Sequence, residues 1–520
     1  MLLAVIGMPA LGAVLLALWP QGADRLARLL AVGVTGLTFL ASLGLLAGRT
    51  GGAAGDWQRL DVSWVPAIDL RLHLGVDGIS LPLVLLTTLL TFLCAVYTVR
   101  SVPPPGRPAT MLALVLVLEA GMVGTFLARD LLLFFVFFEV VLAPMYFLIA
   151  VWGGGPRARH AATKFVLYTL LGSVLLLVGL LTVYAGAGTL DMVVLAQRHG
   201  AGIPRSTQIG AFLALFLGLA VKSPLWPLHT WLPDAHTEAP TVGSVLLAGV
   251  LLKMGTYGIV RVALPIVPAG AVRVAPALAV LSVAGIIVGA MCCYLQTDLK
   301  RLIAYSSVGH MGFVLLGLST LTAVGIQAAL IANIAHGVIT GLLFFVVGGL
   351  KDRFHTSDLA GIGAGIGVRL PGFGGLLTLA AIASLGLPGL AGFWGEAFAV
   401  AGAYRPAPAL PRTLYAVLAV LAAAGAALAA VYFLRMLRLV VAGPAPAAGP
   451  PPPAGPAPAA GPPPVAGPAP AAGAGADVGP LEWLAWAPLA ILAVVLGLFP
   501  ALVLECTRPA VDLLVRAYAG

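Results

Sequence analysis

Several ionisable side chains interrupt long apolar runs of this sequence, where a charge is costly. Lys222 and Lys253 are two of only five lysines in the 520 residues, and both stand inside such runs. Glu139 and Glu396 do the same among the acids, and Glu119 is a weaker case. A charge at the centre of a membrane helix costs about 2.5–3.5 kcal/mol on the insertion scale, and residues kept there usually carry ions or protons. These residue types therefore predict a proton or ion relay.

Two histidines extend this set. His310 follows Ser306 and Ser307 by four and three residues, so the three side chains share one face of a helix. His336 has Thr340 one turn further on. Imidazole titrates near neutral pH, and a face of hydroxyls and imidazoles can pass protons. A single histidine in a membrane more often only joins two helices by a hydrogen bond. A role in proton transfer is favoured here because several other ionisable residues also lie in apolar runs.

Each of these residues also has a purely structural interpretation. The long side chain of Lys222 could reach a membrane surface, and the acids could be buried hydrogen-bonding groups. Two positions weaken that interpretation. Lys253 lies about halfway along SVLLAGVLLKMGTYGIV, and eight apolar residues directly precede Glu139. Neither side chain is near an end of its run.

The composition places the whole chain in a membrane. Hydrophobic residues make up 60% and charged residues only 9%, against roughly 25% charged in an ordinary soluble domain. These values exclude a soluble globular enzyme, a disordered chain and a collagen-like repeat. The net charge of +9 comes from basic residues spread thinly over loops, so we expect no nucleic-acid partner. The cysteines lack metal-ligand spacing and are expected to be small buried side chains: Cys94, Cys292, Cys293 and Cys506.

Apolar runs bounded by charges, proline or glycine predict an all-α polytopic membrane protein with about 14 transmembrane helices. Long unbroken runs favour helices over a transmembrane barrel, whose strands alternate in short segments. The first run has no basic start, so we expect it to be retained as a helix. The predicted helices are residues 2–19, 27–47, 78–99, 110–128, 131–151, 162–185, 208–226, 241–262, 274–295, 301–319, 321–349, 372–402, 413–440 and 484–504.

Two of these helices, the seventh and the twelfth, are expected to be broken. The run at 208–226 ends in Lys222-Ser223-Pro224, with Pro227 close behind. The run at 372–402 is interrupted by Gly-Leu-Pro-Gly at 386–389. Proline removes a backbone donor and clashes with the preceding turn. Broken membrane helices line polar cavities, because the freed backbone groups need partners.

The ionisable residues repeat in a way that suggests two inverted copies. Glu139 precedes Lys222 by 83 residues, and His310 precedes Glu396 by 86. Both intervals end on a broken helix. The copies are offset by five helices, an odd number, so they would cross the membrane in opposite directions, as in transporters with inverted repeats. Lys253, which lies between the copies, is the natural link of a route from Lys222 past His310 and His336 to Glu396.

Loop charges and one low-complexity segment complete the organisation. Basic residues divide 14 to 12 between the two sides of the predicted helices, and all three loop lysines fall on the larger side. The positive-inside rule then places both termini outside. Residues 443–476 consist of Ala, Gly and Pro apart from one Val, and GPAPAAG recurs every 12 residues. We expect this segment to be a disordered or polyproline-like cytoplasmic linker without a further role.

Four stretches carry a resemblance to a known family. They are DLLLFFVFFEVVLAPMYFLI at 130–149, KSPLWPLHTWLPDAHTEAPTVGSVLLAGVLLKMGTYGIVR at 222–261, DLKRLIAYSSVGHMGF at 298–313 and LPGLAGFWGEAF at 387–398. From about residue 75 to 440 the chain resembles the M-type membrane subunits of bacterial NADH:quinone oxidoreductase (respiratory complex I), relatives of mitochondrial chain 4. The related Mrp-type cation/proton antiporter subunits share this core.

The resemblance implies a fourteen-helix proton channel in which helices 4–8 and 9–13 are inverted repeats. It implies a facing pair of Glu139 and Lys222 and a central lysine, Lys253. The L and N siblings usually carry lysine on broken helix 12, whereas M carries glutamate, as Glu396 does. Gly392 stands where the family often has asparagine. The implied parts are residues 1–109 with helices 1–3, a first repeat at 110–262, a second repeat at 274–440, the linker at 443–476 and a last helix within 481–520.

The resemblance also implies where the chain works. Its partners would be the L and N siblings and, through them, the hydrophilic redox arm, in a bacterial inner membrane. NADH, FMN, Fe–S clusters and quinone would be used by other subunits, because this chain has no nucleotide, flavin or Fe–S motif. Two functions stay open: a proton-pumping module driven by redox chemistry elsewhere, and a subunit of a Mrp-type cation/proton antiporter driven by an ion gradient.

Overall fold

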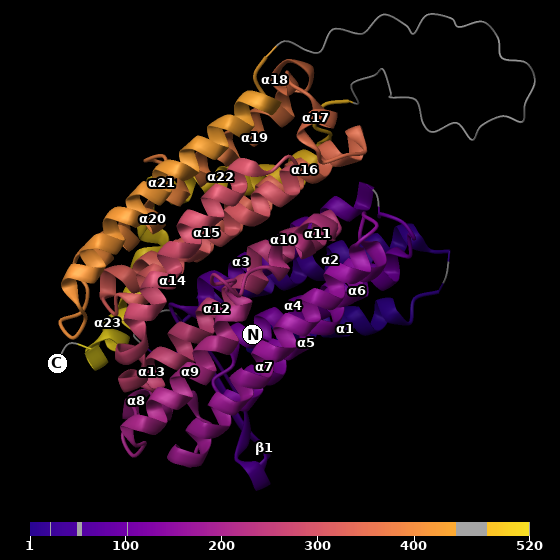
Figure 1. Cartoon of the computed structure of the whole chain (residues 1–520). Coiled ribbons are helices and arrows are strands. Elements are labelled where there is room, and N and C mark those ends of the chain that lie inside the picture. Colours follow the sequence, from indigo (N-terminus) through magenta and orange to yellow (C-terminus); the bar gives the residue numbers. More distant parts are fainter. Residues whose placement is uncertain (21, 49–54, 101, 444–475, 519–520) are drawn as a thin grey trace, which may run out of the picture.

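The computed structural model describes residues 1–20, 22–48, 55–100, 102–443 and 476–518. Within them the chain is a bundle of long helices with one β-hairpin (Figure 1). By length and composition, eleven helical segments of the described part could cross a membrane, as expected of a membrane protein. The predicted linker at 443–476 lies outside the described residues, apart from the residue at each of its ends.

The N-terminal part contains the hairpin, which the prediction of an all-α fold did not include, whereas the described chain is otherwise mostly helical as predicted. The two strands pair antiparallel, with Gln58 opposite Val76. The sequence pattern explains them, because Leu60, Val62 and Trp64 alternate with polar residues at the period of a strand. The elements are α1 Leu2–Ala17, α2 Asp24–Leu43, η1 Gly44–Leu46, β1 Gln58–Val65, η2 Pro66–Ile68, β2 Leu70–Val76 and α3 Ser80–Arg100.

The middle of the chain differs from the predicted helices in two places. The helix predicted at 131–151 is interrupted at Val141, and the helix predicted at 241–262 contains two π-helical stretches, η3 and η4. The elements are α4 Pro108–Leu127, α5 Leu131–Val140, α6 Leu142–Trp152, α7 Ala158–Ala187, α8 Met192–Arg198, α9 Arg205–Lys222, α10 Trp231–Glu238, α11 Thr241–Leu246, η3 Leu247–Leu251, α12 Leu252–Gly258, η4 Ile259–Ala263 and α13 Leu264–Ile266.

The last part of the chain follows the predicted helices more closely. After the final predicted helix, a further helix, α23, continues the chain. The elements are α14 Pro268–Leu295, α15 Leu299–Ser319, α16 Ala323–Phe354, α17 Leu359–Ile362, α18 Ile366–Arg369, α19 Pro371–Ser384, α20 Ala391–Tyr404, α21 Arg412–Val440, α22 Pro480–Leu498, α23 Ala501–Val515 and η5 Arg516–Tyr518.

The two predicted helix breaks are confirmed. Helix α9 ends at Lys222, and helical structure resumes only at Trp231. Helix α19 ends at Ser384, and α20 begins at Ala391. Proline and glycine within these gaps explain why the helices stop. Both breaks therefore offer backbone groups to a polar interior.

Two helical segments form the centre of the bundle. In Thr241–Ile266 and in Ala323–Phe354, 94% of an 18-residue apolar window is buried within this chain, against 39% for Ala158–Ala187. These central segments carry Lys253 and His336. The most buried part of the molecule is thus the part that holds two of the ionisable residues.

Two backbone crossovers in the bundle have the same hydrogen-bond pattern. Asp130 pairs with Asp191 where α5 and α8 begin, and Asp298 pairs with Asp358 where α15 and α17 begin. In both crossovers, the N–H group of the residue after each aspartate donates to the carbonyl oxygen of the residue before the other aspartate. The N···O distances are 2.7 to 2.9 Å. Figure 1 places α8 toward the bottom and α17 toward the top of the view. We call the end with β1, β2, α8, α13 and α23 the hairpin face, and the opposite end the far face.

Candidate functional site

The two central segments place Lys253 against His336. Lys253 on α12 is fully buried, and its Nζ lies 2.5 Å from Nδ1 of His336 on α16. The ammonium group also donates to the carbonyl of Ala248, within η3. π-Helical turns are rare and recur at functional sites. The lysine is held between a backbone acceptor and an imidazole that can take its proton.

His310 on α15 contacts both parts of the broken helix α19–α20. Its Nε2 lies 2.9 Å from Oγ of Ser384, the last residue of α19, and its Nδ1 lies 3.2 Å from Oε1 of Glu396 on α20. The latter distance is that of an ion pair, but Oε1 lacks an aligned hydrogen bond. Transfer of a proton between the two therefore requires the imidazole or the carboxyl group to turn.

The two histidines connect these contacts into one series. Their ring centroids lie 5.6 Å apart. Both histidines and Glu396 border a small cavity of about 20 Å³, measured as space for the centre of a water molecule, which holds about one water. Nε2 of His336 is buried and has no hydrogen-bond partner in the described residues. Lys253, His336, His310 and Glu396 are thus brought together, but the two histidines stand in the reverse of the predicted order, since His336 lies next to Lys253 and His310 next to Glu396.

The broken helix positions Glu396 by close packing at glycines. Gly386 has a φ of +75°, and a Cβ there would lie 2.5 Å from Oε2 of Glu396. A Cβ at Gly392 would lie 2.2 Å from the carbonyl oxygen of Ala383. The asparagine expected from the family resemblance at position 392 would therefore require a shift of this break.

In the first half of the chain, Glu139 and Lys222 do not form the expected direct ion pair. Glu139 is half-buried in the last turn of α5 and accepts a hydrogen bond from Ser173 on α7. Lys222 ends α9 and is buried, with its Nζ 4.9 Å from the ring centroid of Phe138. A cation over an aromatic face is stabilised by the ring quadrupole. The aromatic ring, rather than a carboxylate, is the immediate partner of the lysine here.

A close contact connects the first half with the centre. A Cβ at Gly255 would lie 2.3 Å from Oγ of Ser223, so α12 approaches the end of α9 closely. Ser223 follows Lys222 directly, and Gly255 is two residues after Lys253. The two lysines therefore lie on backbones that touch, although within the described part of the chain no hydrogen bond joins their side chains.

Glu119 stands apart from this series. It is fully buried on α4, and neither carboxyl oxygen has a hydrogen-bond partner in the described part of the chain. No hydrogen bond or ion pair joins it to Lys253, His310 or Glu396 there. The structure assigns this acid no place in the series.

Several partners of the predicted residues were missed from the sequence. Ser173, Ser384 and Phe138 belong to elements that only the fold brings near Glu139, His310 and Lys222. Ser384 had a signal, because it directly precedes the predicted break. The other two lie in apolar runs with nothing to distinguish them.

Comparison with known proteins places this chain in a broad group. Residues 128–428 match the family described as NADH:quinone oxidoreductase/Mrp antiporter, TM. NADH-quinone oxidoreductase subunit M of Rhodobacter capsulatus is 38% identical over 98% of this chain and 95% of its own. NAD(P)H-quinone oxidoreductase chain 4 of a Synechococcus species is 44% identical over 73% of this chain and 71% of its own.

Two solved structures share the fold. A chain of respiratory complex I from Thermus thermophilus with bound NADH superposes with a TM-score of 0.84 at 29% identity, and both chains are covered completely. A chain of the Mrp complex from Dietzia sp. gives a TM-score of 0.83 at 23% identity, over 100% of this chain and 99% of that one. The second likeness concerns the fold alone.

Proposed function

The chain belongs to the transmembrane family shared by NADH:quinone oxidoreductases and Mrp antiporters, and from this premise we propose that it is the M-type, proton-translocating subunit of a bacterial NADH:quinone oxidoreductase. Sequence identity along nearly the whole chain with a subunit M supports this over the Mrp alternative, because the chain of the Mrp complex is similar in fold alone. Glu396 on the broken helix supports the same choice, since the resemblance gives the M type glutamate at this place.

The series Lys253–His336–His310–Glu396 is the observation that carries the proposal. Each member is a group that can bind or release a proton. Lys253 Nζ lies 2.5 Å from His336 Nδ1, the two imidazole centroids lie 5.6 Å apart, and His310 Nδ1 lies 3.2 Å from Glu396 Oε1. Burial in an apolar bundle makes ionisable groups costly unless they serve such a purpose. No nucleotide or redox motif in the sequence offers a competing use for them.

A proton would move through this series by exchange at named atoms. The Lys253 ammonium gives a proton to Nδ1 of His336, which leaves a neutral amine and an imidazolium. His336 releases a proton from Nε2 into the small cavity, where a water molecule passes it to His310. His310 then protonates Glu396 from Nδ1 after the carboxyl group turns. Ser384 holds Nε2 of His310 and so fixes the ring during this step.

Lys222 and Glu139 would load Lys253 from the first half of the chain. The contact between Ser223 and Gly255 brings the two lysine-bearing backbones together. Glu139 would act at longer range than a direct pair, since Phe138 lies beside Lys222. Glu119 is left out of the path.

The two matching crossovers support the proposed inverted repeats, helices 4–8 at 110–262 and helices 9–13 at 274–440. The same pair of backbone hydrogen bonds, flanking two aspartates that face each other, occurs once on each face of the bundle. Inverted repeats place equivalent elements on opposite faces. With the broken segments counted as spans, we propose about 14 transmembrane helices in the bacterial inner membrane, with both termini outside.

As a complex subunit, this chain would meet its cofactors only through partners. We expect electron transfer among NADH, FMN, Fe–S clusters and quinone in other subunits, reached through the L and N siblings. The free energy of that reaction must arrive as a conformational or electrostatic change that alters which member of the series holds the proton.

Replacement of Lys253 by methionine tests the proposal. Methionine keeps the length and apolar stem of lysine without a proton to give. In membrane vesicles with the assembled complex, we expect NADH-driven proton uptake to fall about tenfold or more. Lys351→Met, at the end of α16, is the matched control and should keep uptake. Wild-type uptake by the Lys253→Met variant would refute the proposed function.

A further inference from the structure

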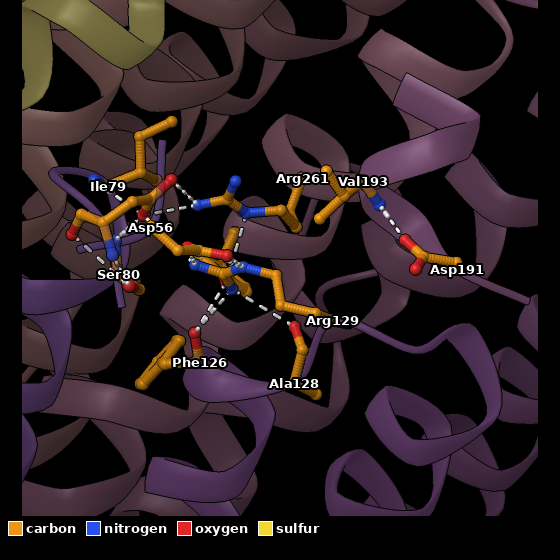
Figure 2. Close-up of polar contacts among 11 residues, drawn as sticks. Asp56, Ile79, Ser80, Phe126, Ala128, Arg129, Asp191, Val193 and Arg261 are labelled. Atoms are coloured by element: carbon orange, nitrogen blue, oxygen red, sulfur yellow. Dashed lines mark hydrogen bonds and ion pairs between the residues drawn. The ribbon is translucent and has the colours of Figure 1, made fainter. Parts of the chain in front are cut away.

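A cluster of two arginines and two aspartates lies at the hairpin face, outside the proposed proton series (Figure 2). Nη2 of Arg261 lies 2.6 Å from each carboxylate oxygen of Asp77. Nη2 of Arg129 lies 2.7 Å from Asp56 and 3.5 Å from Asp77. Arg129 and Asp77 are almost fully buried, with 1% and 3% of their side chains exposed. The cluster therefore holds four charges where a membrane bundle would otherwise be apolar.

Tyr257 connects this cluster to the helix of Lys253. Its hydroxyl oxygen accepts from Arg129 and from Arg261, each at 3.3 Å, and its proton goes to the carbonyl of Phe126 at 2.7 Å. Lys253, Tyr257 and Arg261 are spaced four residues apart, so they follow one face of α12 and η4. Eight residues of helix correspond to about 12 Å. The cluster is therefore two turns from the central lysine.

A wide cavity reaches the other side of the cluster. It holds about 400 Å³ of space for water and is lined by all four charged residues together with Leu513 and Arg516 of the C-terminal segment. Its size is far above the space that one water molecule needs. The cavity thus ends about two helical turns from Lys253, with Tyr257 and the charged cluster between them along this helix.

The chemistry of these separating groups opposes proton transfer. A guanidinium group keeps its protons at any working pH and has no lone pair to accept another. The hydroxyl of Tyr257 is fully used, because it accepts from two permanent cations and donates to a backbone carbonyl that leads no further. In the histidine series, by contrast, every member exchanges protons.

We propose that Arg129 and Arg261, held by Asp56 and Asp77, form an electrostatic seal that keeps Lys253 from exchanging protons with the water at the hairpin face. This role rests on the proposed function, since it matters only where Lys253 carries protons. The seal forces a proton on Lys253 to leave through His336 rather than along its own helix. The competing interpretation is an ion cluster that merely fastens the hairpin to the bundle.

Passive proton flux through liposomes with the reconstituted complex tests the seal, because it needs neither NADH nor quinone. After an imposed pH step, we expect Arg261→Gln to raise the flux about tenfold or more. Arg261→Gln combined with Asp77→Asn removes both charges of one pair, leaves no new unpaired charge, and should leak similarly. Arg261→Lys keeps the charge and should stay tight.

Two controls separate the seal from its alternatives. Arg71→Gln breaks the hairpin's own ion pair, 2.7 Å from Asp61, and should not leak. Lys253→Met added to Arg261→Gln should abolish the leak. Wild-type flux in both Arg261→Gln variants, or a leak that survives Lys253→Met, would overturn the seal. Normal NADH-driven uptake in Lys253→Met alone would instead overturn the proposed function.

Discussion

His310 on α15 and Glu396 on α20, the second half of a broken helix, meet at 3.2 Å between Nδ1 and Oε1. Both side chains are only slightly exposed, at 13% and 12%. Ser384, at the end of α19, binds the other nitrogen of the imidazole. The break between α19 and α20 is therefore the place where the histidine series ends on an acid.

Gly386 should be needed for the position of Glu396. An alanine there would meet Oε2 of Glu396 at 2.5 Å and would adopt a φ of +75°, which costs an L-residue about 1–2 kcal/mol. Gly389→Ala is the matched control, because its φ is +92° but nothing lies within 4 Å. We expect similar losses of thermal stability in both variants and a fall in proton uptake only in Gly386→Ala. Equal uptake in the two variants would contradict the proposed role of this contact.

Glu139 should matter for pumping through its ionisation rather than through a direct pair with Lys222. Glu139→Gln keeps an acceptor for the Ser173 hydroxyl, so we expect assembly to be normal and proton uptake to fall about tenfold. Ser173→Ala removes one hydrogen bond to a half-buried carboxylate, a loss of about 1–2 kcal/mol, and should leave most of the uptake. Assembly on native gels and uptake in vesicles measure both. A Ser173→Ala variant as defective as Glu139→Gln would show that the hydrogen bond, not the charge, is what counts.

The hairpin face should resist mild acid. Burial by itself raises the pKa of Asp77, but the positive charges of Arg261 and Arg129 outweigh it, and the pKa lies below its ordinary value. A carboxyl group whose folded pKa is depressed adds stability above its unfolded pKa of about 3.9, and that stability is lost as the pH falls through the folded value. We expect the hydrogen-exchange protection of residues 70–80, relative to the intrinsic exchange rate at each pH, to stay high from pH 7 to 5 and to fall only well below pH 4.

Asp77→Asn is the control for this pH dependence. It leaves the two arginines with one carboxylate fewer, and breaking a buried pair commonly costs about 3–5 kcal/mol. Exchange of residues 70–80 should then be fast already at pH 7. A wild-type hairpin that loosens between pH 7 and 5 would be at odds with the depressed pKa of Asp77.

The sequence predicted the features that depend on local chemistry. Proline and glycine after Lys222 and around Pro388 predicted where the helices break, because these residues stop a helix whatever surrounds them. The rarity of charge in apolar runs predicted which side chains meet in the series from Lys253 to Glu396. The broken helices and the members of the series could therefore be inferred before the structure, whereas the order of the two histidines, which depends on how α15 and α16 pack, was predicted the wrong way round.

Features that depend on packing between distant elements could not be inferred. The hairpin was overlooked, because its alternating pattern lies in a short stretch between two long apolar runs. The distance between Glu139 and Lys222 depends on how α5 and α9 both pack on α7, and the ring of Phe138 lies beside the ammonium group of Lys222. The Tyr257 contacts with Arg129 and Arg261 join residues 128 and 4 positions apart. The contact with Arg129 forms only when the whole chain is folded, whereas the contact with Arg261 follows from the local helix.

Proton uptake per NADH oxidised, in vesicles with Glu396→Gln, tests the central claim most directly. Glutamine keeps the size of glutamate and its hydrogen bonds but cannot take a proton from His310. Glu505→Gln, on the exposed side of α23, is the matched control. The histidine series predicts an assembled complex whose uptake falls about tenfold or more in Glu396→Gln and is unchanged in the control. Wild-type uptake per NADH in assembled Glu396→Gln would remove this acid from the path and contradict the account.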